Sequence, residues 1–333
     1  MVRDVDLIRS ARFRQEREAD WKRLETLVAM VERRGLHAMD FADARDLSAL
    51  YRQATTSLSI AREISLDKGL LTYLEALTAR AYLSVYAPQE RLGGIFQRFF
   101  TQGAPAAMRR SALYVLAAIL CMGLGWLVGY LLYQENSAWF HVFIPDTLAG
   151  GRGPGATTQM LRDVIFDAEP ETTGLAAFAA YLFSHNTRIA IFVFGLGAFA
   201  CAPSVLLTFY NGLIIGAMHA LYAERSLGWE LLGWLSIHGV TELLAICIAC
   251  GGGLKLGYAV LFPGQNTRKE ALRLAGRDAA KLALVAALML VAAALIEGFL
   301  RQLIQDTNTR YLLGFSFGAL WLVWFSYRGK TRA

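Results

Sequence analysis

The chain has 333 residues, of which 55% are hydrophobic and 18% are charged, and its formal net charge is +6. Soluble domains are about 45–50% apolar and about 25% charged, so this composition excludes an ordinary soluble protein. Residues 1–110 contain 18 Lys and Arg and 14 Asp and Glu, whereas long stretches after Ser111 contain none. This asymmetry indicates an aqueous part followed by a membrane part. Because the basic residues cluster beside the hydrophobic runs, as orientation signals do, we expect no nucleic-acid partner.

The first 90 residues are predicted to form a cytosolic domain of three helices. Apolar residues recur there at helical spacing in three separate segments, and three such stripes can bury a small common core. Asp46 directly precedes the second stripe and is a predicted helix N-cap, because its carboxylate can accept from a free amide of the first turn. The stripes are Trp21, Leu24, Val28 and Val31; Leu47, Leu50, Tyr51, Ala54, Leu58 and Ala61; and Leu70, Leu74, Leu77, Ala81 and Val85.

Residues 91–110 combine aromatic and basic side chains, which is typical of a helix lying on a membrane surface. We therefore interpret them as an interfacial linker helix on the inner leaflet, with an ordinary linker as the alternative. The residues concerned are Phe96, Phe99 and Phe100, flanked by Arg91, Arg98, Arg109 and Arg110.

Residues 111–333 are predicted to form a transmembrane helical domain with about six spans. A bilayer core about 30 Å thick requires about 20 apolar residues in a helix. One long run contains Gly251, Gly252 and Gly253, so a tilted, kinked or partly re-entrant helix fits it. The fold class is therefore all-α, a polytopic membrane helix bundle behind a soluble helical domain. The predicted spans lie at 112–133, in two parts of 189–222 separated at Pro203, at 231–262, at 279–299 and at 311–325.

The distribution of charge predicts the orientation of these spans. Arg109 and Arg110 precede the first span, and both the loop 263–281 and the C-terminal tail are basic, whereas residues 134–185 are mostly acidic. The positive-inside rule then places both termini in the cytosol and residues 134–185 in a loop on the outer face. The predicted location is the cytoplasmic (inner) membrane.

Several polar residues lie within the predicted spans, namely Asn211, His238, Glu242 and Glu297. Ionisable groups inside a bilayer cost about 2.5–3.5 kcal/mol each, so their presence needs a reason. His238 and Glu242 are four residues apart and share one face of a helix. They are either a polar clamp that orients helices, worth about 0.6 kcal/mol per contact, or a functional site such as a proton relay, an ion site or a catalytic pair.

Glycines also recur in the spans, which favours close helix packing or self-association. No recognised catalytic motif accompanies them. The HxxxE spacing lacks the second histidine of a zinc protease motif, and neither a GxxxxGK[ST] loop nor a GxSxG motif occurs. We expect no catalytic residue, no metal, no cofactor and no enzymatic activity. The predicted packing positions are Gly212, Gly239, Gly251, Gly252 and Gly253.

Short segments spread over most of the chain resemble the stage II sporulation protein M family of bacterial membrane proteins, and they occur in the family's order. The most specific are the HG-x-x-E stretch within IHGVTELLAI and the L-I-E-G-F stretch within AALIEGF. His238, Glu242 and Glu297 match polar positions of the family. Asn186 matches one of two family asparagines, the other being replaced here by His185. The resembling segments are 47–64, 71–86, 184–199, 210–218, 237–246, 251–264 and 293–299.

The resemblance implies a non-enzymatic membrane component. The sporulation member works beside a peptidoglycan hydrolase and a partner membrane protein, and relatives are associated with a MoxR-type AAA+ ATPase and von Willebrand A-like proteins. This chain departs from the sporulation member in its extended N-terminal soluble domain. We therefore expect a homo-oligomeric scaffold or anchor in the lipid bilayer that recruits such cell-envelope partners. The alternative is a transporter or channel-like component with a midplane polar path.

Overall fold

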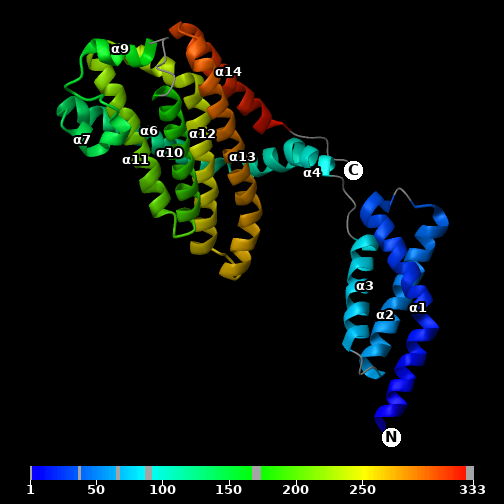
Figure 1. Cartoon of the computed structure of the whole chain (residues 1–333). Coiled ribbons are helices and arrows are strands. Elements are labelled where there is room, and N and C mark those ends of the chain that lie inside the picture. Colours follow the sequence, from blue (N-terminus) through cyan, green and yellow to red (C-terminus); the bar gives the residue numbers. More distant parts are fainter. Residues whose placement is uncertain (1, 37–38, 65–67, 87–91, 167–173, 328–333) are drawn as a thin grey trace. The chain divides into compact units, whose positions relative to one another are not determined.

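The computed structural model describes residues 2–36, 39–64, 68–86, 92–166 and 174–327, and every regular element in these ranges is a helix. The chain divides into two compact units, Met1–Ile95 and Phe96–Ala333. Figure 1 shows the first unit in blue and cyan and the second from cyan-green to red. The predicted all-α fold class is confirmed.

The first unit consists of three helices, α1 (Val2–Arg34), α2 (Phe41–Ile64) and α3 (Lys68–Tyr86). The three predicted apolar stripes form its core, where Leu24 and Leu74 are completely buried. Leu50, Tyr51 and Val85 are partly buried and pack against that core. Each helix thus contributes one apolar face, as the spacing predicts.

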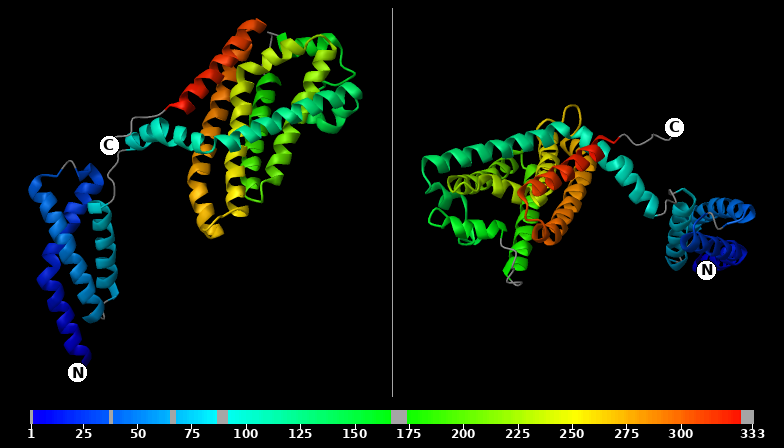
Figure 2. Two further views of the ribbon diagram at one scale, coloured as in Figure 1. Left: turned by 180° about the vertical axis from the view of Figure 1, so that it is seen from behind. Right: turned by 90° about the horizontal axis from the view of Figure 1, so that it is seen from above.

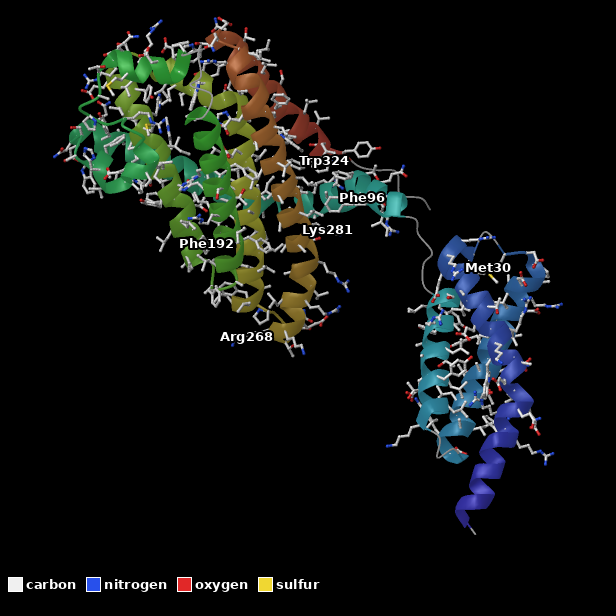
Figure 3. The ribbon with its side chains drawn as sticks, viewed as in Figure 1. Met30, Phe96, Phe192, Arg268, Lys281 and Trp324 are labelled. Carbon is white, nitrogen blue, oxygen red and sulfur yellow. The ribbon has the colours of Figure 1, made fainter. Side chains whose placement is uncertain are left out.

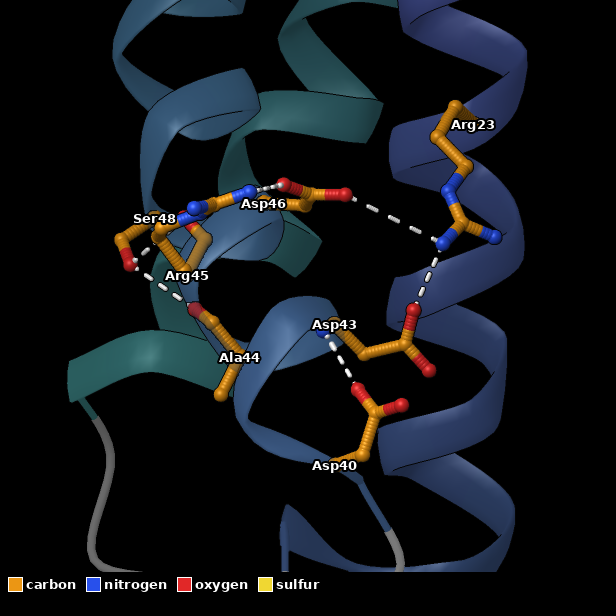
Figure 4. A network of polar contacts seen from close by, with 7 residues as sticks. All are labelled: Arg23, Asp40, Asp43, Ala44, Arg45, Asp46 and Ser48. Carbon is orange, nitrogen blue, oxygen red and sulfur yellow. Dashed lines mark hydrogen bonds and ion pairs between the residues drawn. The ribbon is translucent and has the colours of Figure 1, made fainter.

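The start of α2 differs from the prediction, because its N-cap is Asp40 and not Asp46. The Asp40 Oδ1 accepts from the backbone amide of Asp43 at 2.7 Å, and Asp43 Oδ1 in turn accepts from Arg23 Nη2 of α1 at 2.6 Å (Figure 4). Asp46 lies inside the helix, 4.0 Å from the same guanidinium. The apolar stripe begins late because the first turn of α2 faces water and the first buried residue is Leu47, so the stripe alone does not mark the helix start.

The second unit is built on six long helices among the described residues, with shorter ones between them (Figure 2). The short elements are α4 (Leu92–Arg98, which begins before the unit boundary), η2 (Phe99–Gly103), α5 (Ala104–Arg110), α7 (Trp139–Phe143), α8 (Asp146–Ala149) and α9 (Thr158–Phe166). The long helices are α6 (Ala112–Glu135), α10 (Gly174–Gly197), α11 (Ala202–Glu224), α12 (Gly228–Leu261), α13 (Arg268–Leu303) and α14 (Thr307–Ser326).

Within the described part of the chain, α6, α11, α12 and α13 are long and apolar enough to cross a membrane. The other two long helices, α10 and α14, lie at the positions of the remaining predicted spans and pack against α12. The chain is therefore an all-α membrane bundle, whereas the number of about six spans stays a prediction.

Two boundaries of the bundle bear on the predictions. The break expected at Pro203 is confirmed, since α11 begins at Ala202 after a turn in which Ala200 and Cys201 have φ of 61° and 67°. Residues 174–185, predicted as part of the outer-face loop, form the first half of α10 instead. The predicted boundary follows the polar run 184–188, but this run lies inside the helix, where His185 and Asn186 line a cavity, and residues 174–183 before it are again apolar.

The helix α12 continues through Gly251, Gly252 and Gly253 without a break, so of the tilted, kinked and partly re-entrant forms predicted for this run the re-entrant one is wrong. Glycine is a poor helix former in isolation. Here each of the three faces a neighbouring helix, and close packing compensates for the low helix propensity.

Two long helices that pack closely, α6 and α11, are not neighbours in sequence. Gly125 of α6 lies against Phe209 of α11, and Gly129 lies against Leu213, so the two helices run in the same direction. By the same reasoning α12 runs parallel to α10 and α14. The chain therefore alternates between two sets of helices that run in opposite directions.

The segment from η2 to α5 is attached to the end of α14. The indole nitrogen Nε1 of Trp324 donates to the carbonyl oxygen of Phe100 at 2.9 Å, and Arg109 Nη1 donates to the carbonyl oxygen of Tyr327 at 2.7 Å. Figure 3 shows Phe96, which is exposed, on α4 just before this segment, and it labels Lys281 on α13 and Trp324 on α14. The interfacial role of residues 91–110 stays a prediction.

Candidate functional site

The polar residues predicted from the sequence come from four helices of the bundle. Asn186 belongs to α10, Asn211 to α11, His238 and Glu242 to α12, and Glu297 to α13. All except the half-buried Asn186 have buried side chains. Four of the five line a single cavity of about 130 Å³, and Glu297 lies outside its wall. Residues separated by more than 50 positions thus meet at one place in the bundle.

The cavity lies between α10, α11 and α12. Leu148 of α8 and Arg152, which follows α8, also line it. Between its polar groups the wall is apolar, and it includes Ile214, Met218 and Trp234. A mostly apolar cavity with a few convergent polar groups is the usual form of a small-molecule site.

Glu242 is the centre of the polar contacts in the cavity. The side-chain amide of Asn186 is hydrogen-bonded to its carboxylate, and Glu297 is close enough to interact with it electrostatically. The ring of His238 meets Trp234 edge to face, with 5.9 Å between centroids. Two carboxylates that approach each other away from water repel, so this part of the cavity favours a proton or a positively charged group.

Arg152 is a cavity residue that the sequence pattern did not single out. Its Nε donates to the carbonyl oxygen of Ala149 at 2.8 Å and its Nη2 to that of Leu148 at 2.7 Å, which holds the guanidinium against the end of α8. His185 also lines the cavity. Arg152 could have been noticed in the sequence because the charged residues of 134–185 are mostly acidic and few are basic.

The predicted packing glycines fall into two groups. Gly212 lies against the backbone of α6, Gly251 against Val115 of α6, and Gly252 and Gly253 against α10. Gly239 lines the cavity instead, and the nearest atom to a Cβ added there is the Cβ of Leu235 in its own helix, at 3.8 Å. A side chain at Gly239 would therefore enter the cavity.

A second polar cluster lies at the other end of α12. Lys255 Nζ donates to Asp278 Oδ2 at 2.7 Å and to Ser111 Oγ at 3.0 Å. Arg110 forms a bidentate pair with the same carboxylate, from Nε at 3.0 Å and from Nη2 at 2.5 Å. The sequence shows Lys255 as an isolated charge in an apolar run, and the structure shows that it joins α12 to α13 and to the start of α6.

Arg310, at the start of α14, is the largest fully buried side chain in the described part of the chain. Its Nη2 donates to the carbonyl oxygen of Ile165 at 2.9 Å and its Nε to that of Ile304 at 2.8 Å. The guanidinium also lies over the ring of Phe166, 5.4 Å from its centroid. It therefore holds α9 against the turn between α13 and α14. In the ranges that the structure describes, no group of three or more His, Cys, Asp or Glu side chains is placed to hold a metal ion.

Two family models match the chain in regions that correspond to its two units. The model described as stage II sporulation protein M matches residues 118–301, which is 184 of the 333 residues. A model described as a domain of unknown function, DUF8413, matches residues 11–87. No curated protein and no solved structure matches the chain.

Proposed function

The chain belongs to the stage II sporulation protein M family, and we propose that it is a non-enzymatic membrane anchor that recruits partner proteins of the cell envelope. The observation that carries this proposal is the three-helix unit Met1–Ile95, which has its own core and its own family match beside the membrane bundle. A separate domain of this kind is well suited to presenting a binding surface, with the bundle holding it at the cytoplasmic membrane. Both termini are then cytosolic.

The surface of the three-helix unit offers one conspicuous feature at the end of α3. Tyr82 and Tyr86 are 52% and 61% exposed, and with the partly buried Tyr51 they form a cluster with ring centroids 5.2–6.4 Å apart. Tyrosine is enriched at the centres of protein interfaces because it combines a large apolar ring with a hydroxyl group. The partners to which the proposal extends are the MoxR-type AAA+ ATPase, von Willebrand A-like proteins or a cell-wall hydrolase.

The test is a mild-detergent affinity purification of the tagged full-length chain from its native membrane, analysed by mass spectrometry and mass photometry. We expect a homo-oligomer that carries one of these cell-envelope proteins. The double variant Tyr82→Ala, Tyr86→Ala should lose at least about tenfold of that partner, as loss of interface anchors does.

The matched control is Arg12→Ala with Glu16→Ala, an exposed pair on α1 with the same spacing of four residues. It should retain the partner and the particle mass. A monomer without partners from the unsubstituted chain would refute the proposal, and so would equal losses in the two double variants.

The second candidate function is a transporter or channel-like component, and the convergence of Asn186, Asn211, His238 and Glu242 on one cavity favours it. A helix broken at Gly251, Gly252 and Gly253 would also favour a transport pathway, because irregular backbone at membrane depth can line one. The helix is continuous there, so this argument does not apply.

Reconstituted vesicles with an internal pH indicator test this candidate. If the cavity carries protons, Glu242→Gln should reduce the initial flux on the order of a hundredfold, because a positioned acid–base group is lost. Glu230→Gln, on the same helix but outside the cavity wall, should leave the flux unchanged. Vesicles of the unsubstituted chain that are no more permeable than empty vesicles would eliminate the candidate.

A further inference from the structure

Next to the polar cavity lies a second, larger hollow of a different character. It is a groove of about 570 Å³ between α6, α11, α12 and α14, and every residue that lines it is apolar or glycine. Trp126, Gly123 and Phe315 are among these residues. Because α6, α11 and α12 are helices of a membrane bundle, the apolar groups available to occupy this groove are the acyl chains of lipids.

The cavity and the groove share a wall. Ile215 of α11 and Leu243 of α12 line both of them. Leu243 directly follows Glu242 in α12, and of these two residues only Leu243 also lines the groove. Two aliphatic side chains therefore separate a small charged compartment from a long apolar one.

The charges of the cavity specify what the polar end of an occupant must contain. Glu242, close to Glu297, supplies a carboxyl group to the cavity, and two neighbouring carboxyl groups favour a cationic partner. Arg152 supplies a guanidinium to the same cavity, and guanidinium groups are the preferred partners of phosphate. An occupant that satisfies both groups carries a positive and a negative group on one small head.

We propose that the cavity and the groove together bind a single aminophospholipid. Its ammonium group lies against Glu242, its phosphate is oriented toward Arg152, and an acyl chain passes between Ile215 and Leu243 into the groove. Lipids also coat the rest of a membrane protein, where no such pair of opposite charges selects a headgroup. A preference for an amine headgroup therefore distinguishes this site from general coating. The proposal does not rest on the anchor or the transporter function, although it concerns the same cavity as the transporter candidate.

Native mass spectrometry of the purified full-length chain in detergent tests the site, with phosphatidylethanolamine, phosphatidylglycerol and phosphatidylcholine of identical acyl chains added separately. We expect phosphatidylethanolamine to bind with a Kd at least about tenfold lower than the other two, as a hydrogen-bonded ammonium–carboxylate pair implies. Glu242→Gln should abolish this preference and Glu230→Gln should preserve it.

The groove is tested with two leucine substitutions at glycines whose added Cβ would meet no atom within 4 Å, Gly123 in the groove and Gly195 outside it. Gly123→Leu should weaken binding of all three lipids alike, while Gly195→Leu should change none. Equal affinity for the three lipids would overturn the proposal, as would tighter binding of phosphatidylglycerol. If the unsubstituted chain is a dimer and Gly123→Leu makes it a monomer, the groove binds a second copy of the chain, and the proposal is also overturned. Unchanged thermal unfolding of each variant shows that the fold is intact, and a variant that fails this check is replaced by Leu243→Trp at the shared wall.

Discussion

Replacing Gly212 by leucine is expected to force two helices of the bundle apart. A Cβ at Gly212 would meet the carbonyl oxygen of Met122 and the backbone nitrogen of Trp126, both on α6. Backbone atoms cannot move aside as the end of a flexible side chain can, so α6 and α11 must separate. We expect the free energy of unfolding to fall by at least about 3 kcal/mol, at the upper end of overpacking effects.

Thermal unfolding of the purified chain in detergent measures this effect. The midpoint should fall by about 6–12 °C for a chain of this size. Gly195→Leu is the matched control, because Gly195 is also a glycine inside a long helix but has open space around it. Similar midpoints for the two variants would show that α6 and α11 do not pack as described.

The second large effect is expected in the three-helix unit, from Leu24→Ala. Leu24 is completely buried in the core formed by α1, α2 and α3. Removing a buried leucine side chain costs about 2–5 kcal/mol, and whole domains are stable by about 5–15 kcal/mol. The variant unit should therefore open far more often, while the membrane bundle stays folded.

Limited proteolysis of the full-length chain in membranes checks this expectation. Cleavage within residues 2–86 should accelerate on the order of thirtyfold or more, following the larger population of the open form. Leu83→Ala is the control, since Leu83 is exposed on α3. An unchanged cleavage rate for Leu24→Ala would mean that the unit does not depend on this core.

The helices could be predicted where hydrophobicity alone determines them. The apolar stripes of residues 1–90 mark faces that must be buried, and the break before Pro203 follows from the missing backbone donor of proline. The N-cap at Asp40 could not be found this way, because the first turn of α2 faces water and the buried stripe begins only at Leu47. The continuity of α12 also depends on tertiary structure, since Gly251 is stabilised in the helix by its position against Val115 of α6.

The candidate site shows the same division between composition and geometry. Asn211, His238 and Glu242 stand out in the sequence because polar groups in a bilayer are costly, and that argument applies to each residue separately. Whether they meet depends on which helices are neighbours, which no local pattern records. Arg310 illustrates the limit most clearly, since an arginine just after a polar turn is expected at a surface and is completely buried here.

The parallel pairing of α6 with α11 has a consequence for how the protein is made. α6 ends at Glu135 and its partner ends at Glu224, so the ribosome must add 89 further residues before α11 is complete. At about 5–20 residues per second this takes between about 4 and 18 s. During that interval Gly125 and Gly129 have no partner helix from their own chain. Biosynthesis thus includes a period in which the first long helix of the bundle depends on lipid, on the insertion machinery or on another protein to cover the face that α11 later occupies.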